Sequence, residues 1–213
     1  NAEALVLGND YTIDGNTITF TSADASTKIY GLPDGGYTLR EVAAPNGYQV
    51  ITDFLFAVSD GKITTEQPTD REDISVSEAE LVVKDSASEV EINKCDITGK
   101  VEVAGATLQL TVNELAEGVT IDWAKVMENA AIAPTVLNGN DGNQNGIEWT
   151  SADDSAQIIK YLPDGTYTLK ETGGEFESDG VKYSIISTEA TFTIKDGKID
   201  TEGMIGIDNA TYP

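Results

Sequence analysis

Three short segments of this sequence each end on a polar residue that is in phase with apolar neighbours. They are Val90-Glu-Ile-Asn-Lys94, Tyr167-Thr-Leu-Lys-Glu171 and Ile205-Gly-Ile-Asp-Asn209. Successive residues of a β-strand point to opposite faces, so each segment, read as a strand, directs its polar residue toward the apolar side. The pattern therefore predicts an amine, a carboxyl group and a carboxamide that meet inside a β-sandwich.

These three groups can form a covalent bond without a cofactor. Burial lowers the pKa of a lysine and raises that of a glutamate, so Lys94 would be a neutral nucleophile and Glu171 a proton donor to the Asn209 carbonyl. Attack by the amine would expel ammonia and leave an amide cross-link, with Glu171 moving the protons. The alternative is a buried Lys94–Glu171 pair satisfied by the amide, and alternation by itself favours that alternative.

The segment that carries Glu171 has a near copy earlier in the chain. The two copies are Tyr30-Gly-Leu-Pro-Asp-Gly-Gly-Tyr-Thr-Leu-Arg-Glu41 and Tyr161-Leu-Pro-Asp-Gly-Thr-Tyr-Thr-Leu-Lys-Glu171. Each reads as a Pro-Asp-Gly turn that leads into a strand ending on a glutamate. A carboxylate on a core-facing position is costly unless it is paired, protonated or hydrogen-bonded. Both Glu41 and Glu171 are thus candidate functional residues.

The repeat predicts two all-β sandwich domains. We expect the first at 1–85, a short linker at 86–88 and the second at 89–213, with an insertion at 113–148 that has no counterpart in the first half. The expected strands are separated by Gly, Pro, Asn and Asp turns, and residues 64–78 are expected to form a loop. Besides the two repeat strands, the expected strands lie at 4–7, 11–13, 17–20, 49–59, 79–85, 89–94, 104–112, 181–188, 191–195 and 204–209.

Composition narrows the classes of function. The chain has 13 Lys and Arg against 37 Asp and Glu, a net charge of −24, so neither nucleic acid nor an anionic membrane is an expected partner. It contains no histidine and a single cysteine, Cys95, which excludes an internal disulfide and a cysteine-based metal site. We expect Cys95 to be free and to point away from the core. No metal and no cofactor are predicted, and no apolar run approaches the length of a membrane span.

The insertion at 113–148 leaves two alternative functions to consider, ligand binding and calcium binding. Residues 122–131 predict a short helix capped by Asp122, whose apolar side, including Trp123 and Val126, covers the core. A ligand-binding adhesin that uses this insertion is the alternative. Asp141-Gly-Asn143-Gln-Asn145-Gly146 resembles the start of a calcium loop, but Ala152 stands where a bidentate glutamate belongs, so a polar turn is preferred. A hydrolase is the least favoured class, because there is no histidine.

Several motifs, in this order, resemble the collagen-adhesin B-type (CnaB-like, prealbumin-like) domains of Gram-positive pilins and surface adhesins. They are Val90-Glu-Ile-Asn-Lys-Cys-Asp96, Ala104-Gly-Ala-Thr-Leu-Gln-Leu110, Leu162-Pro-Asp-Gly-Thr-Tyr-Thr-Leu-Lys-Glu171 and Ile205-Gly-Ile-Asp-Asn209. The resemblance implies tandem immunoglobulin-like or prealbumin-like β-sandwiches and an autocatalytic isopeptide bond between Lys94 and Asn209, assisted by Glu171. It also implies export, display on the cell wall or a pilus, and pilin or surface-protein subunits, or a host or glycan ligand, as partners.

The first half matches this pattern only in part. Glu41 corresponds to the assisting acid and Asp85 to the acceptor, but no lysine-bearing strand precedes them. Leu5 and Leu7 align with Leu108 and Leu110, which places the corresponding lysine about ten positions before Asn1. We therefore expect this domain to lack its opening strand, to have an edge that is empty or filled by another segment, and to leave Asp85 unmodified.

Overall fold

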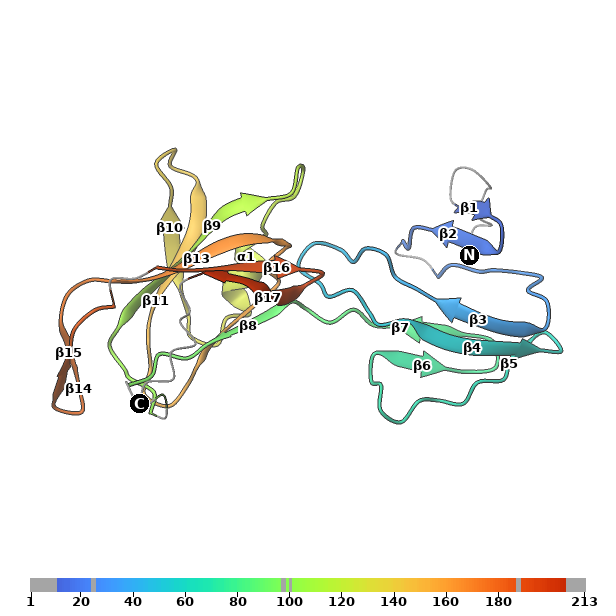
Figure 1. The fold of residues 1–213 in the computed structure, drawn as a ribbon, viewed down its shortest axis with the longest axis horizontal. Helices are drawn as coiled ribbons and strands as arrows, with labels where there is room; N and C mark the ends of the chain where they lie inside the picture. The colour runs from blue at the N-terminus through green and yellow to red at the C-terminus, as the bar shows by residue number, and fades with distance from the viewer. Residues whose placement is uncertain (1–10, 24–25, 97–98, 100, 187–188, 206–213) are drawn as a thin grey trace. The chain divides into compact units, whose positions relative to one another are not determined.

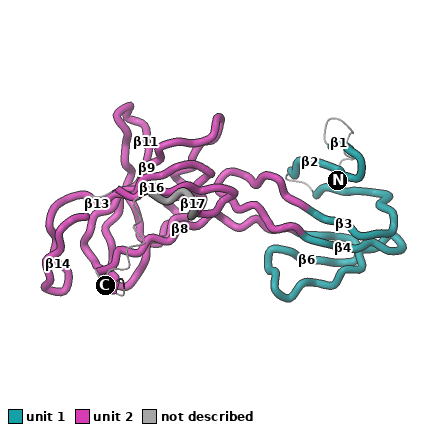
Figure 2. The backbone as a smooth tube through the Cα atoms, in the orientation of Figure 1, with its two compact units in different colours: residues 1–39, 54–82 teal, residues 40–53, 83–213 magenta. Residues whose placement is uncertain are grey.

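The computed structural model describes residues 11–23, 26–96, 99, 101–186 and 189–205, with side chains described as far as residue 200. The chain divides into two compact units, shown in different colours in Figure 2. The first consists of Asn1–Leu39 and Phe54–Val82, and the second of Arg40–Asp53 and Val83–Pro213. The segment 40–53 thus belongs to the second unit, although the sequence places it in the first half.

The second unit is built on a six-stranded antiparallel sheet (Figure 1). Its strands, in spatial order, are β10 (Thr135–Asn138), β11 (Gln144–Thr150), β9 (Thr107–Leu115), β13 (Gly165–Thr172), β16 (Ala190–Lys195) and β17 (Lys198–Ile205). A second layer pairs β8 (Glu89–Ile92) with β12 (Gln157–Lys160). A separate hairpin joins β14 (Phe176–Ser178) to β15 (Val181–Tyr183).

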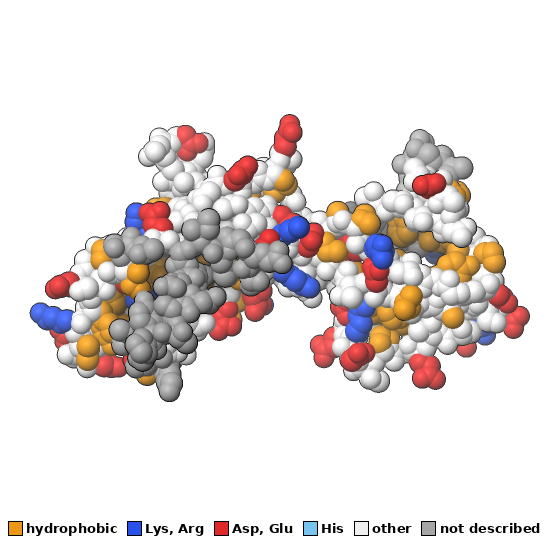
Figure 3. All heavy atoms as spheres, viewed as in Figure 1, with side chains coloured by type: hydrophobic (Ala, Val, Ile, Leu, Met, Phe, Trp, Pro, Cys, Tyr) orange, Lys and Arg blue, Asp and Glu red, His pale blue; other side chains and the backbone are white. Residues whose placement is uncertain are grey.

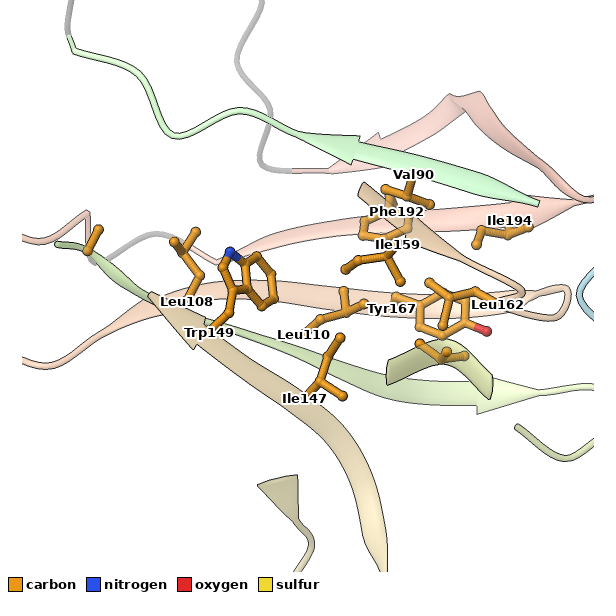
Figure 4. Packing of buried hydrophobic residues seen from close by; sticks show 12 residues of the cluster. Val90, Leu108, Leu110, Ile147, Trp149, Ile159, Leu162, Tyr167, Phe192 and Ile194 are labelled. Carbon is orange, nitrogen blue, oxygen red and sulfur yellow. The ribbon is translucent and has the colours of Figure 1, made fainter. Parts of the chain in front are cut away.

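Apolar side chains from the two layers form the core of this unit. Tyr167 and Leu110 of the large sheet and Ile159 of the small one are fully buried and belong to one cluster. Figure 4 shows Val90 and Ile159 lying near Phe192, from the strand that follows β13 in the large sheet. Burial of alternate residues in β8 and β12, Val90 and Ile159 among them, agrees with the predicted period of two. The sandwich expected for the second half is confirmed.

The insertion contributes one helix to this core. Helix α1 (Trp123–Glu128) begins after Asp122, whose side chain accepts a hydrogen bond from the N–H of Lys125. Val126 is fully buried in the cluster, and Trp123 packs against it half-buried. The prediction that this helix covers the core is confirmed, although the helix is shorter than 122–131. The rest of 113–148 includes the end of β9, β10 and the start of β11.

The first unit consists of short antiparallel pairs. Strands β1 (Tyr11–Asp14) and β2 (Thr17–Phe20) form the predicted hairpin, and β3 (Gly35–Leu39), β4 (Phe54–Ser59) and β5 (Lys62–Ile63) form a sheet in that order. The expected loop at 64–78 is wrong in one place, because β6 (Ile74–Val76) pairs with β7 (Leu81–Val83). A strand of three residues is too short to show an alternating pattern in the sequence.

The two copies of the repeat adopt the same local structure. Tyr37 lies opposite Phe56 between β3 and β4, and Tyr167 lies opposite Phe192 between β13 and β16. The ring centroids are 5.4 Å apart in the first pair and 5.7 Å in the second. Each tyrosine hydroxyl donates to a proline carbonyl four residues earlier, at 2.6 Å for Tyr37 and 2.7 Å for Tyr167. The repeat in the sequence is therefore a repeat in space.

The Asp of each Leu-Pro-Asp-Gly turn fixes a second turn farther along the chain. Asp34 accepts a hydrogen bond from the N–H of Asp60, and Asp164 accepts from the N–H groups of Asp196 and Gly197. Both Asp-Gly pairs have positive φ, 51° and 72° at 60–61 and 53° and 72° at 196–197. Such pairs suit the tight hairpin turn that the sequence predicts at both places.

The distribution of charged side chains on the surface agrees with the acidic composition. Figure 3 shows acidic side chains at several separate places on the visible face, with fewer basic ones between them. Among the described residues, no helix has the length and apolar character needed to cross a bilayer.

Candidate functional site

Lys94 and Glu171 come together in the second unit, as the alternation predicts. Lys94 lies two residues beyond β8, where its N–H donates to a carboxylate oxygen of Glu102 and its carbonyl accepts from the N–H of Val103. Glu171 is near the end of β13, opposite Leu108 of β9. The Lys94 Nζ atom lies 3.6 Å from Oε2 of Glu171. Two strands that are far apart in sequence thus place an amine beside a carboxylate.

Both side chains are withdrawn from water. The side chain of Lys94 is 12% exposed and that of Glu171 is 4% exposed. Oε2 of Glu171 also accepts a hydrogen bond of 2.8 Å from the N–H of Ile186. The ring of Phe176 lies beneath the ammonium, with its centroid 5.9 Å from Nζ.

The other carboxylate oxygen distinguishes this site from a fully satisfied ion pair. Oε1 of Glu171 is buried and has no hydrogen-bond partner among the described residues. Buried acceptors are normally paired, so an orphan oxygen beside a buried amine indicates that a further polar group belongs at this place. The N–H2 of a carboxamide would satisfy it.

Asn209, the predicted third member, lies outside the described residues. The strand that leads toward it, β17, pairs with β16, and Ile205 stands opposite Thr191. Strand β16 in turn pairs with β13, the strand of Glu171. The structure places Lys94 beside Glu171, whereas their roles in a cross-link and the participation of Asn209 stay predictions.

In the first half, Glu41 has the same kind of hydrogen bond as Glu171. Its Oε2 accepts from the N–H of Ile51 at 2.7 Å. Burial raises the pKa of Glu41, the Ile51 N–H opposes that shift, and the negative charge of Asp85 adds to it. Asp85 itself is exposed, and none of the ion pairs between described residues includes either carboxylate. This half therefore shows two neighbouring acids where the second half shows an acid and an amine.

Cys95 points to a neighbouring carboxylate. It is free, as predicted, and half-buried, and its Sγ lies 3.8 Å from Oε1 of Glu102. That it points away from the core stays a prediction. Burial raises the pKa of the thiol, and the charge of Glu102 raises it further. A thiol in this state is mostly protonated and a weak nucleophile.

The calcium-like segment forms a turn between β10 and β11. Both carboxylate oxygens of Asp141 accept hydrogen bonds from Asn143, one from its backbone N–H and one from its side chain. These bonds lower the pKa of Asp141. Across the part of the chain that the structure describes, no group of three or more His, Cys, Asp or Glu residues could hold a metal ion. The polar-turn interpretation accounts for this sequence.

Two contributors to the site were not found from the sequence. The strand predicted at 181–188 is wrong beyond Tyr183, where β15 ends, so Ile186 donates its N–H from outside a strand. Phe176 lies on β14, a strand that we did not predict. Neither carries a local signal for its role, because a backbone donor has no residue type and a three-residue strand has no period. Only the folded chain brings the N–H of Ile186 to Glu171 and the ring of Phe176 to Lys94.

Comparison with known protein families gives one match in each half of the chain. The model of the SpaA prealbumin-like fold domain matches residues 5–72 and 88–205, one match in each half. No curated protein and no solved structure matches the chain significantly. SpaA-type domains are structural modules of pilins and surface adhesins of Gram-positive bacteria. The chain belongs to the SpaA prealbumin-like domain family and carries two tandem β-sandwich domains of that type.

Proposed function

We propose that this chain is a structural module of a Gram-positive pilus or surface protein, and that its second sandwich closes one isopeptide bond between Lys94 and Asn209. The observation that supports this is the buried Lys94–Glu171 contact of 3.6 Å, together with the unpartnered Oε1 of Glu171. A purely structural ion pair would be expected to satisfy both carboxylate oxygens.

The reaction needs only these three side chains. A proton passes from the Lys94 ammonium to Glu171, and the neutral amine attacks the side-chain carbon of Asn209. Protonated Glu171 donates to the amide oxygen and stabilises the tetrahedral intermediate. Nζ then loses a second proton, which Glu171 relays to the original amide nitrogen. The C–N bond to that nitrogen breaks, it leaves as ammonia, and an amide bond to Lys94 Nζ remains. The bond forms once in each chain, so this is self-modification and not turnover of a substrate.

Such a bond would suit a protein under tension. Lys94 and Asn209 stand near the two ends of the second domain, so the cross-link would close a loop containing most of it. Cross-links that close long loops restrict the unfolded chain most strongly, in the chain-entropy account used for disulfides. With a single cysteine in the sequence, this amide would be the covalent constraint available to the domain.

The expected partners are other subunits of a pilus or surface assembly, and the expected location is the cell wall or a pilus outside the cell. The alternative of a ligand-binding adhesin has less support. Helix α1 turns its apolar side into the core, where Val126 is fully buried, so this face is not available to a ligand.

The intact mass of the full chain tests the proposal. The wild-type chain should be one ammonia lighter than its sequence requires, and proteolysis should yield a branched peptide that joins the segments of Lys94 and Asn209. Asn209→Ala and Glu171→Gln should each restore the full mass. Lys170→Ala is the matched control, since Lys170 neighbours Glu171 but forms an exposed ion pair with Glu189, and it should cross-link normally. A full-mass wild-type chain would refute the proposed bond.

A further inference from the structure

The segment Pro45–Val50, here called the strap, is held by the second sandwich. Its backbone pairs with residues 86–88, which the sequence predicts as a linker. The N–H of Gln49 donates to the carbonyl of Ser86 at 2.8 Å, and the N–H of Ser88 donates to the carbonyl of Gly47 at 2.9 Å. Tyr48 forms an antiparallel bridge with Ala87 between these two bonds. Residues 86–88 are therefore one side of a docking surface.

The other side of this surface is the turn between β16 and β17. The N–H of Val50 donates to the carbonyl of Asp196 at 3.3 Å. At Gly197 a Cβ atom would stand 2.4 Å from the carbonyl oxygen of Tyr48, a distance that no side chain can accept. On the strap itself, a Cβ on Gly47 would stand 2.5 Å from the carbonyl oxygen of Tyr161. Strap and surface thus meet through two glycines that allow the backbones to touch.

A lysine from helix α1 holds the aromatic ring of the strap. The Nζ of Lys125 donates a hydrogen bond of 2.9 Å to the hydroxyl of Tyr48 and lies 4.5 Å from the centroid of that ring. The same Nζ lies 4.0 Å from the centroid of Tyr161, and the two rings meet edge to face at 5.5 Å. A cation between two aromatic rings is held more firmly than in a single contact of this kind.

The backbone of Tyr161 adopts a costly conformation at this contact. Its φ is 65°, a left-handed conformation that side chains other than Gly, Asn and Asp rarely adopt. The equivalent position in the first repeat is Gly31, which has a φ of 73° and where a Cβ atom would meet nothing within 4 Å. Both copies of the repeat have this conformation, but only the second copy has a tyrosine at the position, and there its ring contacts Lys125 and Tyr48. Strain at a contact site, and relief by glycine where the contact is missing, point to a function for the contact.

We propose that the second sandwich carries a binding surface for a Gly-Tyr strap, and that the chain's own residues 45–50 occupy it. Tyr48 is the anchor, and Lys125 and Tyr161 are the clamp. It follows that 40–53 and 83–205 open as one cooperative unit, although the family match divides the chain between 72 and 88. The strap lies between β3 and β4 in the sequence. The end of β3 and the start of β4 are therefore both joined by the chain to a segment that folds with the second domain.

Hydrogen exchange of the full chain, read by mass spectrometry, tests the proposal. In the wild type, the amides of Gln49 and Ser88 should exchange as slowly as those of β13. Tyr48→Phe and Lys125→Met should speed exchange at Gln49 by about tenfold, which corresponds to about 1.4 kcal/mol. Exchange in β13 should stay unchanged in both variants.

A pair of glycines provides the matched control. Gly197 and Gly61 have the same φ of 72° in equivalent Asp-Gly turns, but nothing lies within 4 Å of a Cβ at Gly61. Both alanine variants bear the same backbone strain, so only Gly197→Ala should release the strap and expose Gln49. Equal exchange at Gln49 in the two variants would overturn the proposal, and so would a wild-type strap that exchanges as fast as an open loop. Neither result depends on whether Lys94 is cross-linked.

Discussion

The buried pair at the centre of the site can be tested without the covalent bond. In an Asn209→Ala chain, where no cross-link can form, we change Glu171 to Gln. Glutamine keeps the size of the side chain and can still accept from the N–H of Ile186, but the charge that faces Lys94 is lost. The Lys94 side chain is 12% exposed, so water replaces little of that interaction. Removing one partner of a buried ion pair costs ~3–5 kcal/mol, and the 3.6 Å separation indicates the lower end of this range.

Urea unfolding followed by tryptophan fluorescence measures this cost in the relevant domain. Both tryptophans of the chain, Trp123 and Trp149, lie in the second unit and pack in or against its core. With a urea dependence of about 2 kcal/mol per molar, a loss of about 3 kcal/mol lowers the midpoint by about 1.5 M. Adding Lys94→Met to the Glu171→Gln chain removes the unpaired charge and should restore most of the stability. A loss below about 1 kcal/mol, or no restoration by Lys94→Met, would refute the buried-pair reasoning.

Three further predictions concern the elements that position the site. Tyr167→Phe should cost ~1–3 kcal/mol in urea unfolding, because it leaves a buried carbonyl without its donor. Tyr37→Phe in the exposed copy, followed by far-UV circular dichroism because its unit has no tryptophan, should cost less, and equal losses would contradict this. Val126→Ala should cost roughly 2 kcal/mol in the same assay, from lost apolar burial and the cavity left in the core, and a neutral result would mean that α1 does not cover the core. Asp85→Asn should lower the pKa of Glu41, measured by NMR titration of its carboxyl carbon. Folding raises this pKa, so its contribution to the free energy of unfolding is present at low pH and is lost as pH rises through the folded-state pKa. The variant should lose less free energy of unfolding over that pH range.

The sequence alone determined the features that depend on local geometry. A period of two fixes which side of a strand a residue faces, so the shared direction of Lys94 and Glu171 could be predicted from the sequence. The Pro-Asp-Gly and Asp-Gly turns follow from the conformational preferences of a few residues, and the two copies of the repeat indicated two sandwiches. The helix at Trp123–Glu128 was predictable from its cap and its apolar side.

Only the tertiary structure decided what depends on contacts between distant segments. The N–H of Ile186 reaches Glu171 because the chain leaves β15 at Tyr183, although a strand was predicted at 181–188. The strap follows the first repeat in the sequence but belongs to the second unit. No pattern in the sequence marks Tyr48 and Tyr161 as partners, and Lys125 is one charge on a predicted helix. Their meeting depends on backbone approach at Gly47 and Gly197, which is set by the packing of strands far apart in the chain. The sequence pattern fixes which way a side chain points within a strand or helix, whereas its contacts with distant segments are fixed by how the strands and helices pack.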